Sequence, residues 1–92
     1  MKEWWILMVK DLYCIFSMFD MTVQIQTEDK TIDEKIPLNR AVETITDFCR
    51  SRNIGTAHLM GNESYLDEIK NNILEYSKSE YGHNVVEIKV NE

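Results

Sequence analysis

The sequence lacks the features that mark several large protein classes. Its only cysteines are Cys14 and Cys49, and it holds 10 basic residues against 16 acidic ones. Two isolated thiols in apolar surroundings are typical of buried, reduced side chains, which favours an intracellular protein over a disulfide-framed one. The formal net charge of −6 opposes non-specific binding to nucleic-acid phosphates. We therefore expect no nucleic-acid partner, whereas an acidic surface would suit a basic protein.

No apolar run is long enough to cross a membrane as a helix. The two most apolar stretches, residues 4–9 and 12–19, are separated by Lys10 and Asp11. Each is far shorter than the roughly 20 residues that a membrane span needs. A basic segment followed by a small-residue cleavage site is also missing. We expect no targeting segment, no membrane partner and a cytoplasmic location.

Repeats, low-complexity tracts and linkers are absent too, so residues 1–92 are expected to form one small domain. A chain of this size buries roughly 60–65% of its unfolded surface. That is enough for a core without metals or disulfides.

The first twenty residues have two interpretations. Residues 3–20 are rich in aromatic and β-branched side chains, and both faces would be apolar, as in a central strand. As a helix, the same segment would place Glu3, Lys10 and Ser17 on one narrow polar stripe, because they recur every seven residues. The composition favours a strand over residues 12–19. Whether Lys10 and Asp11 interrupt it stays open.

A hairpin with one solvated face follows. In residues 22–28 apolar β-branched side chains alternate with Thr and Gln, and after a polar turn residues 31–37 resume a strand. Pro37 suits a strand end because it has no N–H to donate. The acidic excess of the chain gathers on this hairpin, at Glu28, Asp29, Asp33 and Glu34.

The first helix is expected to begin at Asn39, a good N-cap residue. Its apolar face would hold Val42, Ile45 and Cys49, with Phe48 beside them. Glu43, Thr46, Asp47 and Arg50 would face outward. Asn53 tolerates the left-handed conformation that ends many helices.

A short strand over residues 56–60 and a second helix come next. Asn62 or Ser64 would cap the helix, and Gly82 would end it. A last strand over residues 85–90 alternates apolar and charged side chains. The apolar face of the helix would be formed by Leu66, Ile69, Ile73 and Tyr76.

The predicted fold class is α/β (α+β), a mixed five-stranded sheet with two helices in the order β-β-β-α-β-α-β. Both β-α-β connections should be right-handed crossovers between parallel strands. The fall in apolarity outward from the first strand places that strand centrally, between the hairpin and the two later strands.

This order, with an antiparallel meander feeding two parallel crossover strands, resembles the ribonuclease-H-like fold, which actin-like ATPase subdomains share. The resemblance implies clustered carboxylates that hold two metal ions. The predicted first strand, residues 12–19, has none, and Asp11 and Asp20 flank it. Gly61 and Asn62 stand where an acid after the strand over residues 56–60 is expected, so Glu43 on the first helix is the one match. The resemblance therefore extends to the fold, and we expect no nuclease catalysis.

The remaining candidate sites are sparse. His58 and His83 have no ligand spacing to either cysteine, so no metal or cofactor is expected. Gly61, Asn62 and Ser64 lie where a strand leads into a helix, which can hold an anion, but helix capping alone explains these residue types.

Trp4 and Trp5 are the strongest interface candidates. Adjacent strand residues point to opposite faces, so one of the two must find separate cover in a small domain. A homodimer or larger oligomer with either tryptophan at its contact is expected. The sequence thus favours a small acidic, non-enzymatic interaction module that also offers its acidic hairpin to a protein partner. Domains of this type are common among phage and mobile-element accessory proteins. The alternative is a degenerate ribonuclease-H-like, metal-dependent nuclease using Asp20 and Glu43.

Overall fold

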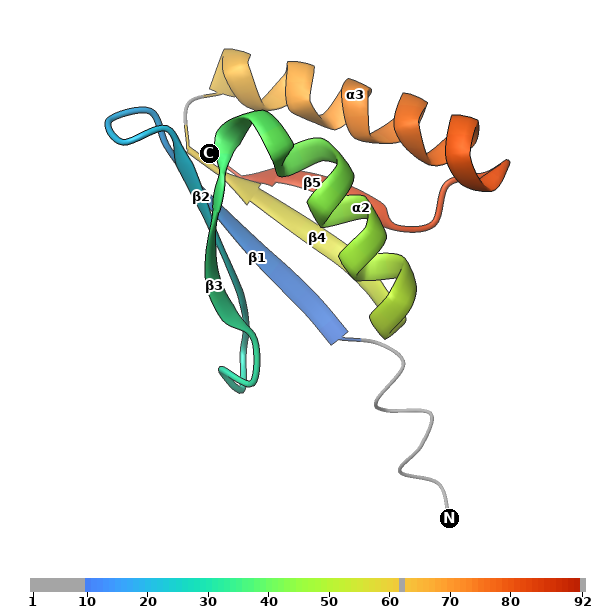
Figure 1. The fold of residues 1–92 in the computed structure, drawn as a ribbon, viewed down its shortest axis with the longest axis horizontal. Coiled ribbons are helices and arrows are strands. Elements are labelled where there is room, and N and C mark those ends of the chain that lie inside the picture. The colour runs from blue at the N-terminus through green and yellow to red at the C-terminus, as the bar shows by residue number, and fades with distance from the viewer. Residues whose placement is uncertain (1–9, 62, 92) are drawn as a thin grey trace.

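A mixed five-stranded sheet forms the centre of the structure, a computed structural model that describes residues 10–61 and 63–91. Its strands are β1 (Lys10–Ser17), β2 (Thr22–Thr27), β3 (Asp33–Pro37), β4 (Ile54–Met60) and β5 (Glu87–Asn91). The first three form an antiparallel meander, and β4 and β5 run parallel to β1 and to each other. The order across the sheet is β3-β2-β1-β4-β5, so the predicted central place of the first strand is confirmed (Figure 1).

Two helices, α2 (Ala41–Arg52) and α3 (Glu63–Tyr81), lie on the same side of this sheet (Figure 1). The alternation of β1 explains the core beneath them, because Leu12 and Cys14 point to the helices and are fully buried. The helices contribute further fully buried side chains, namely Ile45, Leu66 and Ile73. The predicted Val42 and Ile69 are partly buried and pack against this core. Within the described residues, the opposite face of the sheet has no helix over it.

The first strand differs in its bounds from the prediction. The pairing with β4 shifts register between Lys10 and Asp11 without ending the strand, so Asp11 belongs to β1. The strand ends at Ser17, and Phe19, predicted inside it, lies in the turn to β2. The reason is local, because Met21 adopts the left-handed conformation, φ 59°, that reverses the chain. The part of the strand prediction that concerns residues 3–9 lies outside the described residues.

Helix α2 begins later than predicted. Asn39 lies within a 3₁₀ turn (Leu38–Arg40) that follows Pro37, and Arg40 occupies the N-cap position without a side-chain cap. Thr46, predicted to face outward, is fully buried, because its hydroxyl donates to the Val42 carbonyl oxygen at 2.7 Å and so satisfies its polar group inside the helix. The left-handed end at Asn53, φ 57°, is confirmed.

Helix α3 begins at Glu63, so Ser64 lies inside the helix and not at its cap, while Asn62 lies outside the described residues. The predicted end is confirmed, since Gly82 has φ 80° and donates its N–H to the Lys78 carbonyl oxygen at 3.0 Å. Buried Ser77 then fixes the loop to β5, accepting the Val85 N–H at 2.9 Å.

One carboxylate joins the two helices on their outer side. Asp47 of α2 accepts hydrogen bonds from the hydroxyls of Tyr76 and Tyr81 of α3, the second at 2.7 Å. The Arg50 guanidinium lies 4.8 Å from the ring centre of Tyr81. These contacts hold α2 and α3 together as one layer over the sheet.

Candidate functional site

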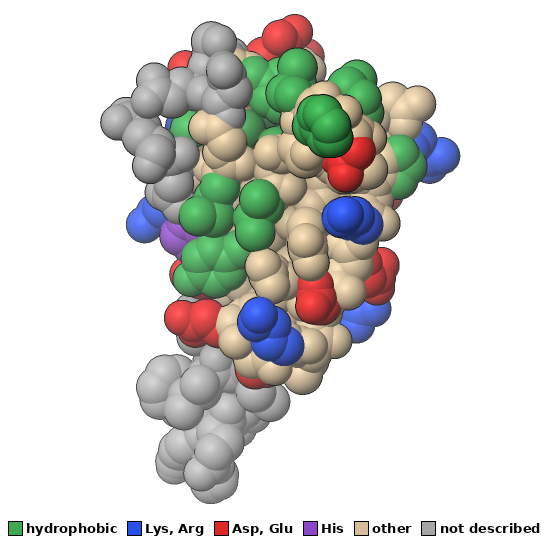
Figure 2. Space-filling model, turned by 90° about the vertical axis from the view of Figure 1, so that its left-hand side faces the viewer, with side chains coloured by type: hydrophobic (Ala, Val, Ile, Leu, Met, Phe, Trp, Pro, Cys, Tyr) green, Lys and Arg blue, Asp and Glu red, His purple; other side chains and the backbone are tan. Residues whose placement is uncertain are grey.

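The turn between β1 and β2 carries the most exposed apolar side chains among the described residues. Phe19 is 99% exposed, and Met18 and Met21 are 55% and 56% exposed. We call these three residues the hairpin tip. Figure 2 shows hydrophobic side chains gathered at the end of the molecule where this turn lies. Large apolar groups placed together in water mark contact surfaces, because monomers rarely leave such groups uncovered.

A hollow adjoins the hairpin tip on the β3 side. It has a volume of about 430 Å³ and is lined by Met21, Pro37, Leu38 and Asn39. The Leu38 N–H donates to the Met21 carbonyl oxygen at 2.9 Å, which ties the end of the β1–β2 turn to the start of the 3₁₀ turn. The tip and the hollow therefore form one contiguous surface.

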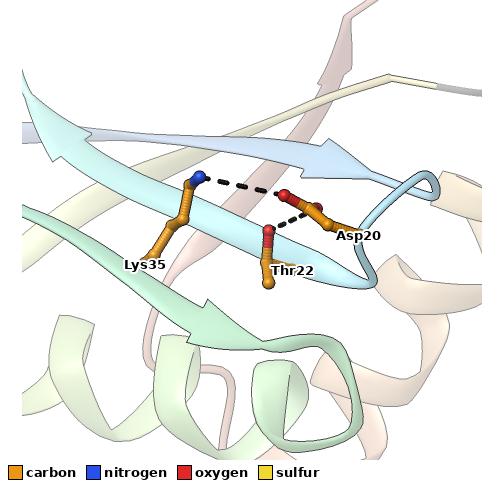
Figure 3. A network of polar contacts seen from close by, with 3 residues as sticks. All are labelled: Asp20, Thr22 and Lys35. Atoms are coloured by element: carbon orange, nitrogen blue, oxygen red, sulfur yellow. Dashed lines mark hydrogen bonds and ion pairs between the residues drawn. The ribbon is translucent and has the colours of Figure 1, made fainter.

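Asp20, a predicted catalytic candidate, fastens this turn instead. Its carboxylate accepts a hydrogen bond from the Thr22 hydroxyl at 2.7 Å and lies 3.8 Å from the Lys35 ammonium of β3 (Figure 3). The hydrogen bond from Thr22, followed by one from Ser17 and by the charge of Lys35, lowers the pKa of Asp20. Asp20 thus holds the base of the hairpin tip against β3.

Glu43, the other catalytic candidate, lies half-buried in the first turn of α2. Because β1 and β3 run in the same direction, the turn that holds Asp20 and the start of α2 lie at one end of the sheet. The two carboxylates are brought to that end, but the described residues contain no group of three His, Cys, Asp or Glu side chains that could hold a metal ion.

The predicted anion-binding segment has another explanation. Gly61 has φ 146°, and a Cβ atom there would lie 3.4 Å from Cβ and from the carbonyl oxygen of Phe16. The glycine therefore permits the close approach of the chain after β4 to β1. Asn62 and the Ser64 side chain lie outside what the structure describes.

A polar group that the sequence interpretation missed lies on the helix-free face of the sheet. Asp11 Oδ2 of β1 lies 3.0 Å from His58 Nε2 of β4, and the His58 ring stacks on Tyr13 with ring centres 4.7 Å apart and an interplanar angle of 8°. His58 is thus half-buried on this face. A carboxylate beside an imidazole fixes its orientation. The parallel register between β1 and β4 reveals this group, because it places His58 directly beside Tyr13.

The acidic hairpin has internal structure of its own. All four of its predicted acids are exposed, but Asp29 accepts hydrogen bonds from Thr27 and Thr31 hydroxyls at 2.7 and 2.8 Å, and Asp33 accepts one from Gln24 at 2.6 Å. These bonds build the β2–β3 turn. It lies at the end of β2 opposite the hairpin tip, so the acidic and apolar surfaces are separate.

The two cysteines are buried thiols, not joined by a disulfide. Burial raises the pKa of Cys49 to about 12, and burial together with the neighbouring Cys49 raises that of Cys14. A thiol held neutral in this way is a poor nucleophile. Trp4 and Trp5, the predicted interface residues, lie outside the described residues.

Comparisons with protein-family models, with curated proteins and with solved structures found no match. Among the helices of the described residues, none combines the length and the apolarity that a membrane crossing requires.

Proposed function

We propose that this chain is a small acidic, non-enzymatic interaction module that contacts a protein partner through its hairpin tip. The observation that carries the proposal is Phe19, fully exposed between two half-exposed methionines on an anchored turn. Aromatic residues and methionine are enriched at the centres of protein interfaces. A partner that covers these side chains gains the hydrophobic free energy that the isolated chain forgoes.

The fastening of the turn supports this role. The Thr22 and Lys35 contacts of Asp20 and the backbone bond from Leu38 to Met21 fix the turn at both ends. A surface held in its binding conformation loses less conformational entropy when the partner arrives. The hairpin tip is thus an exposed apolar surface on a preorganised turn. Asp20 is a positioning residue for this turn.

Two further contacts belong to the proposal. Self-association through Trp4 or Trp5 follows from the adjacent tryptophans, and the acidic β2–β3 hairpin offers negative charge to a basic partner. A place among phage or mobile-element accessory proteins agrees with a short, acidic domain of this kind.

The ribonuclease-H-like fold is part of the same proposal. An antiparallel meander leads into two parallel crossover strands in the order β3-β2-β1-β4-β5, and this order supports the assignment. It also favours the second candidate function, a degenerate metal-dependent nuclease using Asp20 and Glu43. That candidate is the weaker one because Asp20 already binds Thr22 and Lys35. Titration calorimetry with Mg²⁺ or Mn²⁺ distinguishes the two, since the interaction module predicts no specific binding.

Site-specific photo-cross-linking in the source cells tests the main proposal. A photoreactive phenylalanine analogue replaces Phe19 in one variant and exposed Ser79 of α3 in a matched control. We expect a discrete cross-linked protein from position 19 that the control does not give, and its loss when Met18 and Met21 are changed to Ser. Equal products from positions 19 and 79, or none from position 19, would refute a contact at the hairpin tip.

A further inference from the structure

The two edges of the sheet differ in how they are protected. The β3 edge exposes three consecutive charged residues, Asp33, Glu34 and Lys35, and ends at Pro37, which has no N–H to offer. The β5 edge spans Glu87–Asn91 and has no proline. Among the described strands, β5 is paired on one side only, by β4. Its other side is a row of backbone donors and acceptors that can accept one more strand.

The charges of β5 alternate in sign along the helix-free face. Glu87 and Lys89 are exposed, and buried Ile88 lies between them on the helix side. In an antiparallel pair, residues directly opposite share a face and interact most strongly. A charge at one of these positions therefore selects what can lie opposite it.

We propose that a second copy of this chain adds its β5 antiparallel to β5, joining the two sheets into one across a two-fold axis. The inference rests on the proposed self-association and names a surface for it. It is separate from any contact made by Trp4 or Trp5.

Charge complementarity favours β5 of a second copy as the added strand, and it also selects the register of the pair. Two copies of a strand paired by a two-fold axis perpendicular to the sheet must be centred on one residue. Centring on Ile88 places Glu87 opposite the other copy's Lys89, and Lys89 opposite the other copy's Glu87. Centring on Glu87 or on Lys89 would instead set like charges directly opposite each other, which destabilises the pair. The strand is thus self-complementary in one register.

The helix side of the same register is apolar. Ile88 would face its own counterpart, and Val86 would face Val90 of the other copy; Val86 and Ile88 are buried and Val90 is half-buried. A hollow of about 590 Å³ lies beside the start of β5, and its lining combines Leu74 and Val85 with the polar Lys70, Asn84 and Glu87.

Charge exchange on full-length protein tests the pairing. Lys89→Glu gives two acids, and Glu87→Lys two bases, so each variant sets like charges opposite each other in its own dimer. An equimolar mixture of the two restores opposite charges at both positions, as does the double variant Glu87→Lys/Lys89→Glu. Lys78→Glu and Glu75→Lys, at exposed positions of α3, change the net charge equally and are the matched controls. Native mass spectrometry measures the dimer fractions, and circular dichroism confirms that every variant is folded.

We expect the unmodified chain, both controls and the double variant to be dimeric. Each single β5 variant should self-associate at least about tenfold more weakly than the unmodified chain. The mixture should give mainly the heterodimer. If both single variants associate as strongly as the unmodified chain, the β5 pairing is wrong while self-association stands. Weakening in both without heterodimer formation also contradicts the proposed register. If the unmodified chain is a monomer, both the pairing and the self-association it rests on fail.

Discussion

Asp11 and His58, separated by 46 residues in the sequence, lie side by side on the helix-free face of the sheet, with Oδ2 and Nε2 3.0 Å apart. The contact joins β1 to β4, the two central parallel strands. Tyr13 covers the imidazole ring by stacking. A carboxylate, an imidazole and a phenol ring therefore strengthen the sheet on the face that neither α2 nor α3 covers.

Replacing His58 with Ala should lower the free energy of unfolding by about 1 kcal/mol, since a charge-assisted hydrogen bond and a ring stack are lost from a partly exposed site. Urea unfolding at neutral pH measures the effect. A double-mutant cycle with Asp11→Asn isolates the pair, and a coupling energy of zero would show that the contact adds nothing to stability.

Ile73→Ala should cost about 2–5 kcal/mol, because Ile73 is fully buried and its truncation leaves a cavity. Ile69 lies on the same helix but is only partly buried, so Ile69→Ala should cost about 1–2 kcal/mol. Urea unfolding of both variants checks whether Ile73→Ala loses more stability than Ile69→Ala. A larger loss for Ile69 would mean that the buried face of α3 is misplaced.

The raised pKa of Cys49 predicts a loss of stability at alkaline pH. In the unfolded chain this thiol ionises near 9.0, whereas burial raises the pKa to about 12 in the folded protein. The stability linked to the neutral Cys49 thiol is complete below pH 9 and declines as the pH rises toward 12, because over that range only the unfolded state releases the proton. Between about pH 8 and about pH 10, the free energy of unfolding should fall more steeply for the unmodified chain than for Cys49→Ala. Equal slopes would contradict the burial of an un-ionised thiol.

Asp20 contributes stability in the opposite pH direction. Its pKa is lowered in the folded protein, so the stability it adds is present at neutral pH and is lost as the pH falls through the folded value. In Asp20→Asn, the free energy of unfolding should therefore fall less steeply as the pH is lowered into the acid range. The substitution should also weaken photo-cross-linking from position 19, because the turn loses its charged contact with Lys35. Unchanged behaviour in both measurements would remove the positioning role of Asp20.

The proposed interaction module should have no metal-dependent nuclease activity. Branched DNA and RNA–DNA hybrids incubated with the protein and Mg²⁺ or Mn²⁺ should stay intact, and Glu43→Gln should behave like the unmodified chain. Cleavage that Glu43→Gln abolishes would support the degenerate nuclease instead.

The regular elements were predictable because their patterns are local. Alternation in β2 and the apolar spacing of α3 follow from periods of two and 3.6 residues. The helix ends at Asn53 and Gly82 follow from backbone conformations that few residues adopt. The strand order follows from the fall in apolarity outward from the first strand, and the parallel direction of the later strands follows from the β-α-β connections.

The candidate site was harder to predict because it departs from those patterns. Phe19 continues an apolar run, so the pattern extends the strand, while the actual turn is set by the left-handed Met21 and by Asp20 contacts with Lys35. The Asp11–His58 pair depends on the register between two distant strands. Polarity alone places Thr46 at the surface, although its hydroxyl donates to a carbonyl oxygen within the helix and the side chain is buried.

Sedimentation equilibrium at micromolar concentration shows whether the unmodified chain self-associates, with the Trp4→Ser and Trp5→Ser variants measured beside it. A self-associating interaction module should have a mass of twice the 10.9 kDa of the chain or more, and at least one tryptophan variant should have a lower mass. A single species of 10.9 kDa for the unmodified chain would contradict it.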